Sequence, residues 1–240
     1  MQLNPTVEVC FSPKLYGHKL TNGSFITVVV DILRATTSIC AAFDHGVREI
    51  IPVSGLDEAE EMKRKGYFVA CERNGIIIDF ADIGNSASDF IRTDLKGQSV
   101  VFSTTNGTKT INLARDAEEV LIGSFVNLQS LADYLISKKE NIVICCAAWK
   151  NLFNLEDTVF AGALANILLE HGFSTVCDSA LGAVDLWSAA KIDLKNYLAK
   201  CSHRNRLKHL VSDEDFHYTV TLNSTSVIPK LSGDKLVLVD

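Results

Sequence analysis

Polar side chains of several types follow a strongly apolar run near the start of the chain. Residues 25–30 read Phe-Ile-Thr-Val-Val-Val, which is typical of a strand buried on both faces, and Asp31, Arg34, Thr36 and Thr37 come next. The carboxylate could hold a cation, the guanidinium could clamp a phosphate or sulfonate at two points, and the hydroxyls stand where a helix would begin. The alternative is that a threonine only caps the helix while the aspartate and the arginine pair with each other. Because all these groups gather at one strand end, we favour a binding or catalytic role.

A second polar segment follows the apolar run at residues 98–103. It contains Thr105, Asn106, Gly107 and Thr108, so hydroxyls and exposed N–H groups surround a glycine that lets the backbone approach an anion closely. The alternative is an ordinary Asn-Gly turn whose hydroxyls cap the next helix. Taken alone, this segment fits both interpretations equally well.

Carboxylates complete the set of candidate site residues. Glu156 and Asp157 begin a long helix after the apolar run at residues 141–147, although acidic residues there also stabilise the helix dipole. A further polar region supplies Glu72, Asn85 and Ser86. In an open α/β sheet, ligands bind outside the carboxyl ends of the strands, so we expect these segments to meet. Together they favour Mg²⁺ and a doubly charged phosphate over a purely structural explanation.

The elements that must position these residues alternate along the chain. Strands are predicted at residues 25–30, 48–53, 67–71, 98–103, 118–122 and 141–147. Helices are predicted at residues 37–44, 57–65, 109–115, 128–138 and 156–170. This order predicts a three-layer α/β fold with a mainly parallel sheet and helices on both faces.

The final third of the chain has a different pattern. Residues 174–220 are predicted to be mostly helical, and short apolar runs at 227–228 and 236–239 predict late strands, antiparallel and at an edge of the sheet. No linker-like segment interrupts the sequence. We therefore predict one α/β domain over residues 1–240, with two closely packed lobes as the alternative.

Composition narrows the classes of partner. The chain has 240 residues, with 23 Lys and Arg against 29 Asp and Glu, so its formal charge is −6. This balance disfavours nucleic-acid binding, which needs a basic surface. The one basic cluster is interpreted as a solvated face because acidic residues follow it directly. That cluster consists of His203, Arg204, Arg206, Lys208 and His209.

Hydropathy and cysteine usage predict the compartment. No window approaches the roughly 18 apolar residues of a membrane span, and the N-terminus lacks the pattern of a signal peptide. The seven cysteines include no CxxC pair, so we expect reduced, buried thiols in a cytoplasmic protein. A mean hydropathy of +0.16 is compatible with a homodimer.

Common phosphate and hydrolase motifs do not occur in the sequence. It contains no Gly-x-Gly, no Gly-Lys and no Gly-x-Ser-x-Gly, which excludes the dinucleotide fingerprint, the P-loop and the nucleophile elbow. Asp31 follows a strand as in haloacid-dehalogenase phosphatases, but Leu33 stands where that superfamily has a second aspartate.

Five motifs in a fixed order resemble the 2-phosphosulfolactate phosphatase family. They are Asp31-Ile32-Leu33-Arg34-Ala35-Thr36-Thr37, Glu72-Arg73-Asn74-Gly75, Gly84-Asn85-Ser86, Thr105-Asn106-Gly107-Thr108 and Leu155-Glu156-Asp157. The resemblance implies an α/β fold and a Mg²⁺-dependent enzyme of coenzyme M biosynthesis that releases phosphate and leaves 3-sulfolactate. One departure is Ala147-Ala148-Trp149-Lys150, which stands where the family tends to have a glycine-rich turn.

We therefore hypothesise a phosphatase that acts on a small anionic phosphate ester. The residues assigned a catalytic role are Asp31, Arg34 and Glu156, and the Mg²⁺ ligands are Asp31, Glu72, Glu156 and Asp157. The residues assigned to substrate binding are Arg34, Thr36, Thr37, Asn85, Ser86, Thr105, Asn106, Gly107 and Thr108. Either a metal-bound water or Asp31 itself attacks phosphorus. The alternatives are a non-catalytic sensor of a phosphorylated or sulfonated metabolite, and a phosphomonoesterase for another small anion.

Overall fold

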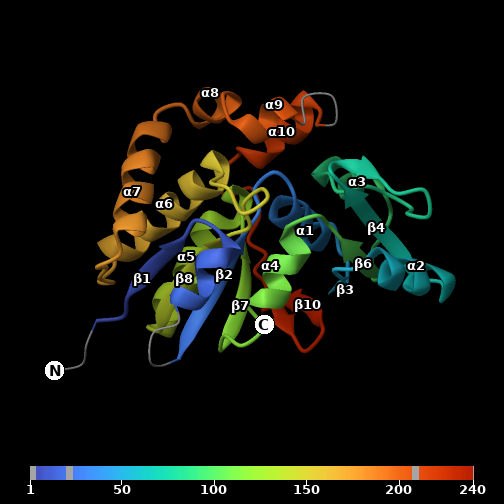
Figure 1. Ribbon diagram of the computed structural model, residues 1–240, viewed down its shortest axis with the longest axis horizontal. Helices are drawn as coiled ribbons and strands as arrows, with labels where there is room; N and C mark the ends of the chain where they lie inside the picture. Colours follow the sequence, from blue (N-terminus) through green and yellow to red (C-terminus); the bar gives the residue numbers. More distant parts are fainter. Residues whose placement is uncertain (1–3, 20–23, 207–210, 240) are drawn as a thin grey trace.

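The computed structural model describes residues 4–19, 24–206 and 211–239, which fold around one ten-stranded sheet (Figure 1). The strand order is β1-β8-β2-β7-β9-β10-β3-β6-β4-β5. The strands are β1 (Val7–Cys10), β2 (Phe25–Val30), β3 (Glu49–Pro52), β4 (Phe68–Arg73), β5 (Ile76–Ile77), β6 (Ser99–Ser103), β7 (Glu119–Gly123), β8 (Asn141–Cys146), β9 (Pro229–Ser232) and β10 (Lys235–Leu238). Within it, β1-β8-β2-β7 and β3-β6-β4 form two blocks of parallel strands, which confirms the α/β prediction.

Helices cover both faces of this sheet. They are α1 (Ala35–Asp44), α2 (Leu56–Arg64), α3 (Ala87–Arg92), α4 (Gly107–Leu113), α5 (Leu128–Lys138), α6 (Leu155–Glu170), α7 (Asp178–Ala190), α8 (Leu194–Ala199), α9 (Ser202–Arg206) and α10 (Asp213–Thr219), with short 3-10 turns at Pro13–His18 and Phe125–Asn127. The predicted strands and helices of the first two-thirds form within two residues of their predicted limits. Three short elements, β1, β5 and α3, were not predicted.

Strand β2 shows why the fold has three layers. Every residue of this strand is buried, and successive side chains point to opposite faces. Val28 and Val30 pack with residues of α5 and α6, whereas Val29 packs with residues of α1, α3 and α4. A run of β-branched residues therefore supplies two apolar cores at once, one on each face of the sheet.

The late strands are antiparallel, as predicted, but their predicted place at an edge is wrong. β9 and β10 form a hairpin in the middle of the sheet, between β7 and β3. The hairpin meets each block through one residue pair, Leu121 with Lys230 and Ile50 with Leu236. Both blocks would otherwise end in open backbone groups at β7 and β3, and the hairpin offers those groups partners. The outer strands are β1 and the two-residue β5.

The C-terminal third is helical, as predicted. In Figure 1, α8, α9 and α10 lie across the top of the molecule, above the sheet. None of the helices in the described ranges has both the length and the apolar character needed to cross a bilayer. All seven cysteines are buried free thiols, which confirms the prediction that they are buried and unpaired.

The hairpin's position leads to a first testable expectation, on stability. Leu236 is fully buried in β10, so Leu236→Ala leaves a cavity where the two blocks join and should lower the free energy of unfolding by about 2–5 kcal/mol. Leu238→Ala is the matched control, because Leu238 lies in the same strand with 41% of its surface exposed. It should cost less than about 1 kcal/mol. Urea unfolding measures both values, and equal losses would contradict a joining role for the buried leucine.

Candidate active site

A cavity of about 340 Å³ lies where the loops after several strands meet. Its lining comes from segments far apart in the sequence, as expected for the carboxyl ends of strands in an α/β sheet. The lining residues are Asp31, Leu33, Arg34, Glu72, Asn74, Gly75, Asn85, Thr105, Asn106, Trp149, Lys150, His203 and Arg206. The structure therefore brings together Asp31, Arg34, Glu72, Asn85, Thr105 and Asn106 of the predicted site residues.

The turn after β2 fixes Asp31 at the cavity. Thr36 closes this turn, since its hydroxyl accepts a hydrogen bond from the Asp31 N–H at 3.1 Å and its own N–H donates to the Asp31 carbonyl. Thr37 donates to the Ile32 carbonyl at 2.9 Å and lies 2.8 Å from the Ser124 hydroxyl. Both threonines are buried and neither lines the cavity, so the geometry gives them a supporting role.

Gly107 lets the loop after β6 approach this turn. A Cβ atom at Gly107 would lie 2.4 Å from the Cβ of Ala35 and 3.0 Å from Oδ2 of Asp31, so only glycine fits. Thr108, next along α4, is buried and bonds back to Thr104. We predicted that the backbone at Gly107 approaches a bound anion closely. The close approach exists, but the group approached is the turn that carries Asp31.

Glu72 ties two loops together at the cavity wall. One carboxylate oxygen accepts from the N–H of Gly75 at 2.5 Å, and the other accepts from the N–H of Thr105 at 2.9 Å. The Thr105 hydroxyl in turn accepts from the N–H of Asn74 at 3.0 Å. These bonds order the turn after β4 and the loop after β6 as one surface, while Glu72 itself is only 5% exposed.

Arg34 lies beside a second, adjoining cavity. This cavity, of about 440 Å³, shares Arg34, Gly75 and Asn85 with the first. Arg34 is 8% exposed as a residue. Its guanidinium contacts the Gly75 carbonyl at 3.4 Å and has no carboxylate within 4 Å among the described residues. Oδ1 of Asn85, which lines both cavities, is buried and has no hydrogen-bond partner among the residues that the structure describes. Ser86 lines the second cavity, where its side chain caps α3.

Glu156 and Asp157, at the start of α6, stand behind the cavity lining. Glu156 Oε1 lies 2.7 Å from Nδ1 of His203, and Asp157 accepts from the Ile32 N–H at 2.9 Å. Each is only 1% exposed, and neither lines the cavity. Glu156 thus holds a lining histidine, and Asp157 holds the turn that carries Asp31.

The carboxylates affect one another's ionisation. The pKa of Asp31 is raised from its ordinary 3.8 to about 6. Burial is the main cause; the charges of Glu72 and Glu156 add to it, and His203 acts in the opposite direction. Burial also raises the pKa of Asp157 well above its ordinary value, with added repulsion from Glu156 and Asp31. Both carboxyl groups are therefore harder to ionise than free ones, chiefly because they are buried and secondly because carboxylates lie near them.

The four predicted Mg²⁺ ligands occupy different positions. Within residues 4–19, 24–206 and 211–239, no three His, Cys, Asp or Glu side chains form a cluster that could hold a metal ion by themselves. Asp31 and Glu72 both line the cavity, and the repulsion at Asp31 is of the kind that a divalent cation relieves. These two residues suit an ion that keeps several water ligands, as Mg²⁺ does. Mg²⁺ binding stays a prediction.

The sequence interpretation missed several lining residues. The prediction that the basic cluster forms a solvated face is wrong for His203, which is 7% exposed and bonded to Glu156, and Arg206 also lines the cavity. No local sequence pattern identifies these two residues, because the preceding helices α7 and α8, and not the sequence of α9 itself, position α9 over the site. Lys208 and His209 lie outside the described residues. Trp149 and Lys150 follow β8 closely, so the strand-end rule could have found them.

Comparison with known proteins gives a consistent family. A family model described as 2-phosphosulpholactate phosphatase matches residues 10–234. A protein of Carboxydothermus hydrogenoformans is 35% identical over 237 residues, covering 97% of this chain and 96% of its own. A Synechocystis protein is 33% identical over 210 residues, covering 85% and 87%, and one from Clostridium novyi is 31% identical over 212 residues, covering 87% and 90%. All three are named probable 2-phosphosulfolactate phosphatases.

The raised pKa of Asp31 makes stability depend on pH. Between about pH 4 and 6 the folded state holds a proton that the unfolded chain releases, so stability falls as the pH rises through this window. Asp31→Asn removes the free-energy cost of keeping a buried carboxylate ionised. At pH 8 in EDTA the variant should therefore be more stable than the native chain by roughly 1–3 kcal/mol. This difference in the free energy of unfolding should disappear below pH 4, where Asp31 is protonated in both the folded and the unfolded state. Urea titrations from pH 3.5 to 8 measure it.

The control for this pH series is Asp116→Asn, which changes an exposed aspartate outside the cavity. Its stability should follow that of the native chain at every pH. If the free energy of unfolding changes with pH in the same way for Asp31→Asn and the native chain, the ionised form of Asp31 does not destabilise the fold.

Proposed function

We propose that this chain, which belongs to the 2-phosphosulpholactate phosphatase family, hydrolyses 2-phosphosulfolactate to 3-sulfolactate and inorganic phosphate in a Mg²⁺-dependent reaction. Family membership places it among phosphoric monoester hydrolases. The observation that supports the proposal most is the contrast within one cavity. Two buried carboxylates, Asp31 and Glu72, line the same cavity as the basic side chains of Arg34, Lys150 and Arg206 and the imidazole of His203. Such a lining suits a small ester with several negative charges.

Arg34 is the group best placed to bind the phosphoryl group. It is nine-tenths buried and has no carboxylate within 4 Å in the described ranges, so its charge is available to a ligand. A guanidinium can make two parallel hydrogen bonds to phosphate oxygens, and low exposure strengthens them. Asn106 and the Thr105 loop, ordered by Glu72, complete the wall around this position.

Asp31 and Glu72 are the residues that would hold Mg²⁺. When bound, the ion supplies positive charge that offsets both carboxylates and the negative charge that develops on the phosphoryl group. The hydrogen bonds that Glu72 accepts from Gly75 and Thr105 fix its carboxylate before any ligand arrives. This fixed orientation is the part of the site that the chain itself contributes.

His203 supplies a proton-transfer group. Hydrolysis breaks the bond between phosphorus and the ester oxygen, and that oxygen must take up a proton to leave as the hydroxyl of 3-sulfolactate. The 2.7 Å bond between Nδ1 and Glu156 directs that nitrogen's proton to the carboxylate and leaves Nε2 for exchange within the cavity. This need exists whether water attacks phosphorus or Asp31 accepts the phosphoryl group first.

The activity test for this proposal is phosphate release from 2-phosphosulfolactate with Mg²⁺ or with EDTA. EDTA should abolish release, and added Mg²⁺ should restore it. Asp31→Asn should lower kcat by several orders of magnitude while the circular dichroism spectrum stays native, because the variant loses the charge at the reacting centre. Asp116→Asn should retain full activity. Retained activity in Asp31→Asn would remove Asp31 from the mechanism.

Binding of the ion has a separate readout. Mg²⁺ should raise the melting temperature of the native chain and should raise that of Asp31→Asn much less, since a ligand that binds only the folded state stabilises it. Equal shifts in both proteins would mean that the ion binds elsewhere.

The proton-transfer role of His203 is tested by His203→Asn. This variant should lower kcat by roughly 10²- to 10⁴-fold and leave KM within about threefold, because the proton is needed in the transition state and not in the bound substrate. His217→Asn is the matched control, since His217 is exposed on α10 and does not line the cavity. A loss confined to KM would assign His203 to binding instead.

A further inference from the structure

We infer that Trp149, Lys150 and Arg206 form a second anion subsite, which binds the acidic group of the substrate's organic part and sets the preference for esters that carry one. This inference rests on the proposed phosphatase function and names a feature of the substrate that the phosphoryl site does not recognise. All three residues line the cavity that contains Asp31 and Arg34.

The indole of Trp149 holds the two cations in place. The Lys150 Nζ lies 5.6 Å from the ring centroid and the guanidinium carbon of Arg206 lies 4.9 Å from it. The His203 ring is 6.1 Å away, tilted by 39°. Cations at these distances are attracted to the face of an indole, so two flexible side chains from different segments are gathered around one ring.

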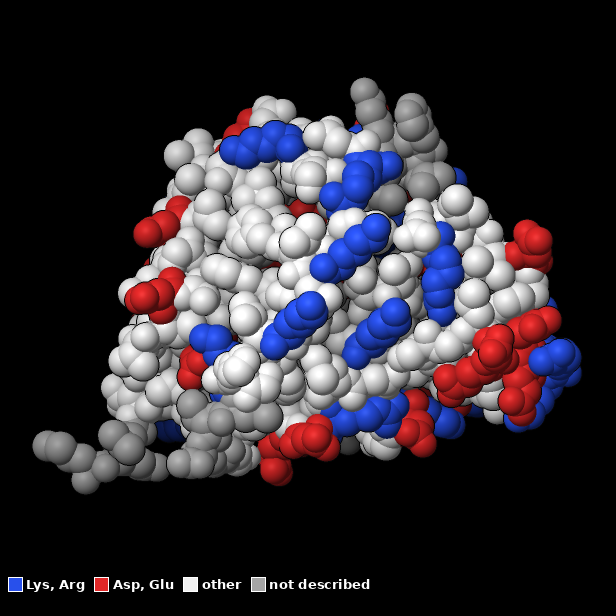
Figure 2. Space-filling view, viewed as in Figure 1, with Lys and Arg blue, Asp and Glu red and all other residues white. Residues whose placement is uncertain are grey.

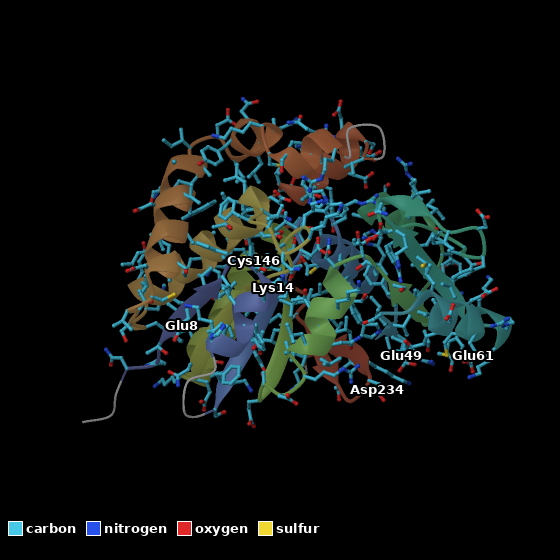
Figure 3. The ribbon with its side chains drawn as sticks, in the orientation of Figure 1. Glu8, Lys14, Glu49, Glu61, Cys146 and Asp234 are labelled. Carbon is cyan, nitrogen blue, oxygen red and sulfur yellow. The ribbon has the colours of Figure 1, made fainter. Side chains whose placement is uncertain are left out.

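The charges of Lys150 and Arg206 have no acidic partner in the described part of the chain. Among residues 4–19, 24–206 and 211–239, no carboxylate lies within 4 Å of either, and the hydrogen-bond partner of Arg206 is the Ser202 hydroxyl, at 3.1 Å. Several charged residues outside the cavity are paired, as is the case for the acidic residues labelled in the lower half of Figure 3. Pairs there are Glu8 with Lys19, Glu49 with Lys235, Glu61 with Lys65 and Asp234 with Arg115. The cavity cations are therefore left for a ligand.

The face of the molecule that is drawn in Figure 2 also carries an excess of positive charge at its centre. Figure 2 shows Lys and Arg side chains across the middle of this face, whereas most Asp and Glu side chains lie at its margins. A chain with a net charge of −6 thus presents positive charge here, which would draw anions toward this face.

The loop that carries Trp149 and Lys150 is built at a conformational cost. Ala148, Lys150 and Asn151 have φ values of 58°, 51° and 61°, in the left-handed region that favours glycine. Paired backbone bonds between Trp149 and Leu152, at 2.8 and 3.3 Å, hold the turn closed. Such conformations persist in non-glycine residues where the surrounding structure fixes them, often at binding sites. Here they place an indole and an ammonium group at the cavity.

Depth separates the two anion sites. Arg34 is 8% exposed and also lines the second cavity, whereas Lys150 and Arg206 are exposed. The phosphoryl group belongs at the buried end, beside Arg34 and Asp31. The acidic group of the organic part then lies near the mouth, beside Trp149. An ester with one phosphate and no further acid would leave this outer subsite empty.

Three esters test the inference: 2-phosphosulfolactate, 2-phospholactate without the sulfonate, and O-phosphoisethionate without the carboxylate. Lys150→Gln and Arg206→Gln should each raise KM for 2-phosphosulfolactate by about 10- to 100-fold, the usual range for losing one charged hydrogen bond. For the ester that lacks the recognised group, the change should stay below about threefold. Insensitivity of 2-phospholactate identifies the sulfonate as that group, and insensitivity of O-phosphoisethionate identifies the carboxylate.

Matched controls separate this effect from general charge. Lys200→Gln removes an ammonium that lies 3.8 Å from the ring centroid of Tyr197, outside the cavity, and should leave all three KM values unchanged. Lys150→Arg keeps the charge and should restore most of the affinity lost in Lys150→Gln. Equal losses on all three esters would overturn the inference while leaving the phosphatase function in place.

A binding measurement keeps the inference testable if no ester is hydrolysed. Calorimetric titration with 3-sulfolactate, and with lactate as the comparison, examines the subsite without chemistry. Binding of 3-sulfolactate should weaken at least about tenfold in the Lys150→Gln, Arg206→Gln double variant and stay unchanged in Lys200→Gln. Equal affinity in the double variant and the native chain would overturn the subsite. Absence of hydrolysis with subsite binding intact would count against the proposed function alone.

Discussion

The Asp31 carboxylate is held in a buried position near the charges of Glu72 and Glu156, and the surrounding structure offsets the repulsion that results. Glu72 accepts bonds from two backbone N–H groups, and Glu156 is bonded to His203. Asp157, deeper still, accepts from the backbone of Ile32. Each neighbour of Asp31 is thus satisfied by a fixed donor, while Asp31 keeps the raised pKa that a ligand could relieve.

This arrangement requires the two parallel blocks of the sheet to meet. Asp31 follows β2, and Glu156 lies in the first turn of α6, the helix that follows β8, so both belong to one block. Glu72 and Thr105 come from β4 and the loop after β6 in the other block. Four strands stand between β2 and β6 in the sheet order, yet Gly107 lies against the Asp31 turn. The β9–β10 hairpin, joined to each block by one residue pair, holds the blocks in one sheet while their loops converge.

The sequence was informative where burial leaves a periodic or compositional trace. Strands such as β2 consist mainly of β-branched residues. Asp31, Arg34 and Thr105 follow such strands, and Glu72 lies in the last two residues of β4. The same rule could not distinguish ligand-facing hydroxyls from those that close turns, because Thr36 and Thr105 stand at similar strand ends. His203 and the central place of the hairpin depend on tertiary packing, which leaves no local pattern.

The cavity keeps opposite charges close together without letting them neutralise one another. Arg34 contacts a carbonyl, Arg206 a hydroxyl and Glu72 backbone N–H groups, so the polar contacts of these three residues are to neutral groups. Side chains free to pair would collapse into internal salt bridges, and a ligand would then have to break them. Groups fixed beforehand can act on a developing charge without reorganising, which is where electrostatic stabilisation is most effective. The buried Asp31 and the left-handed Trp149 loop are therefore costs in the fold that are consistent with a site prepared for an anionic ligand.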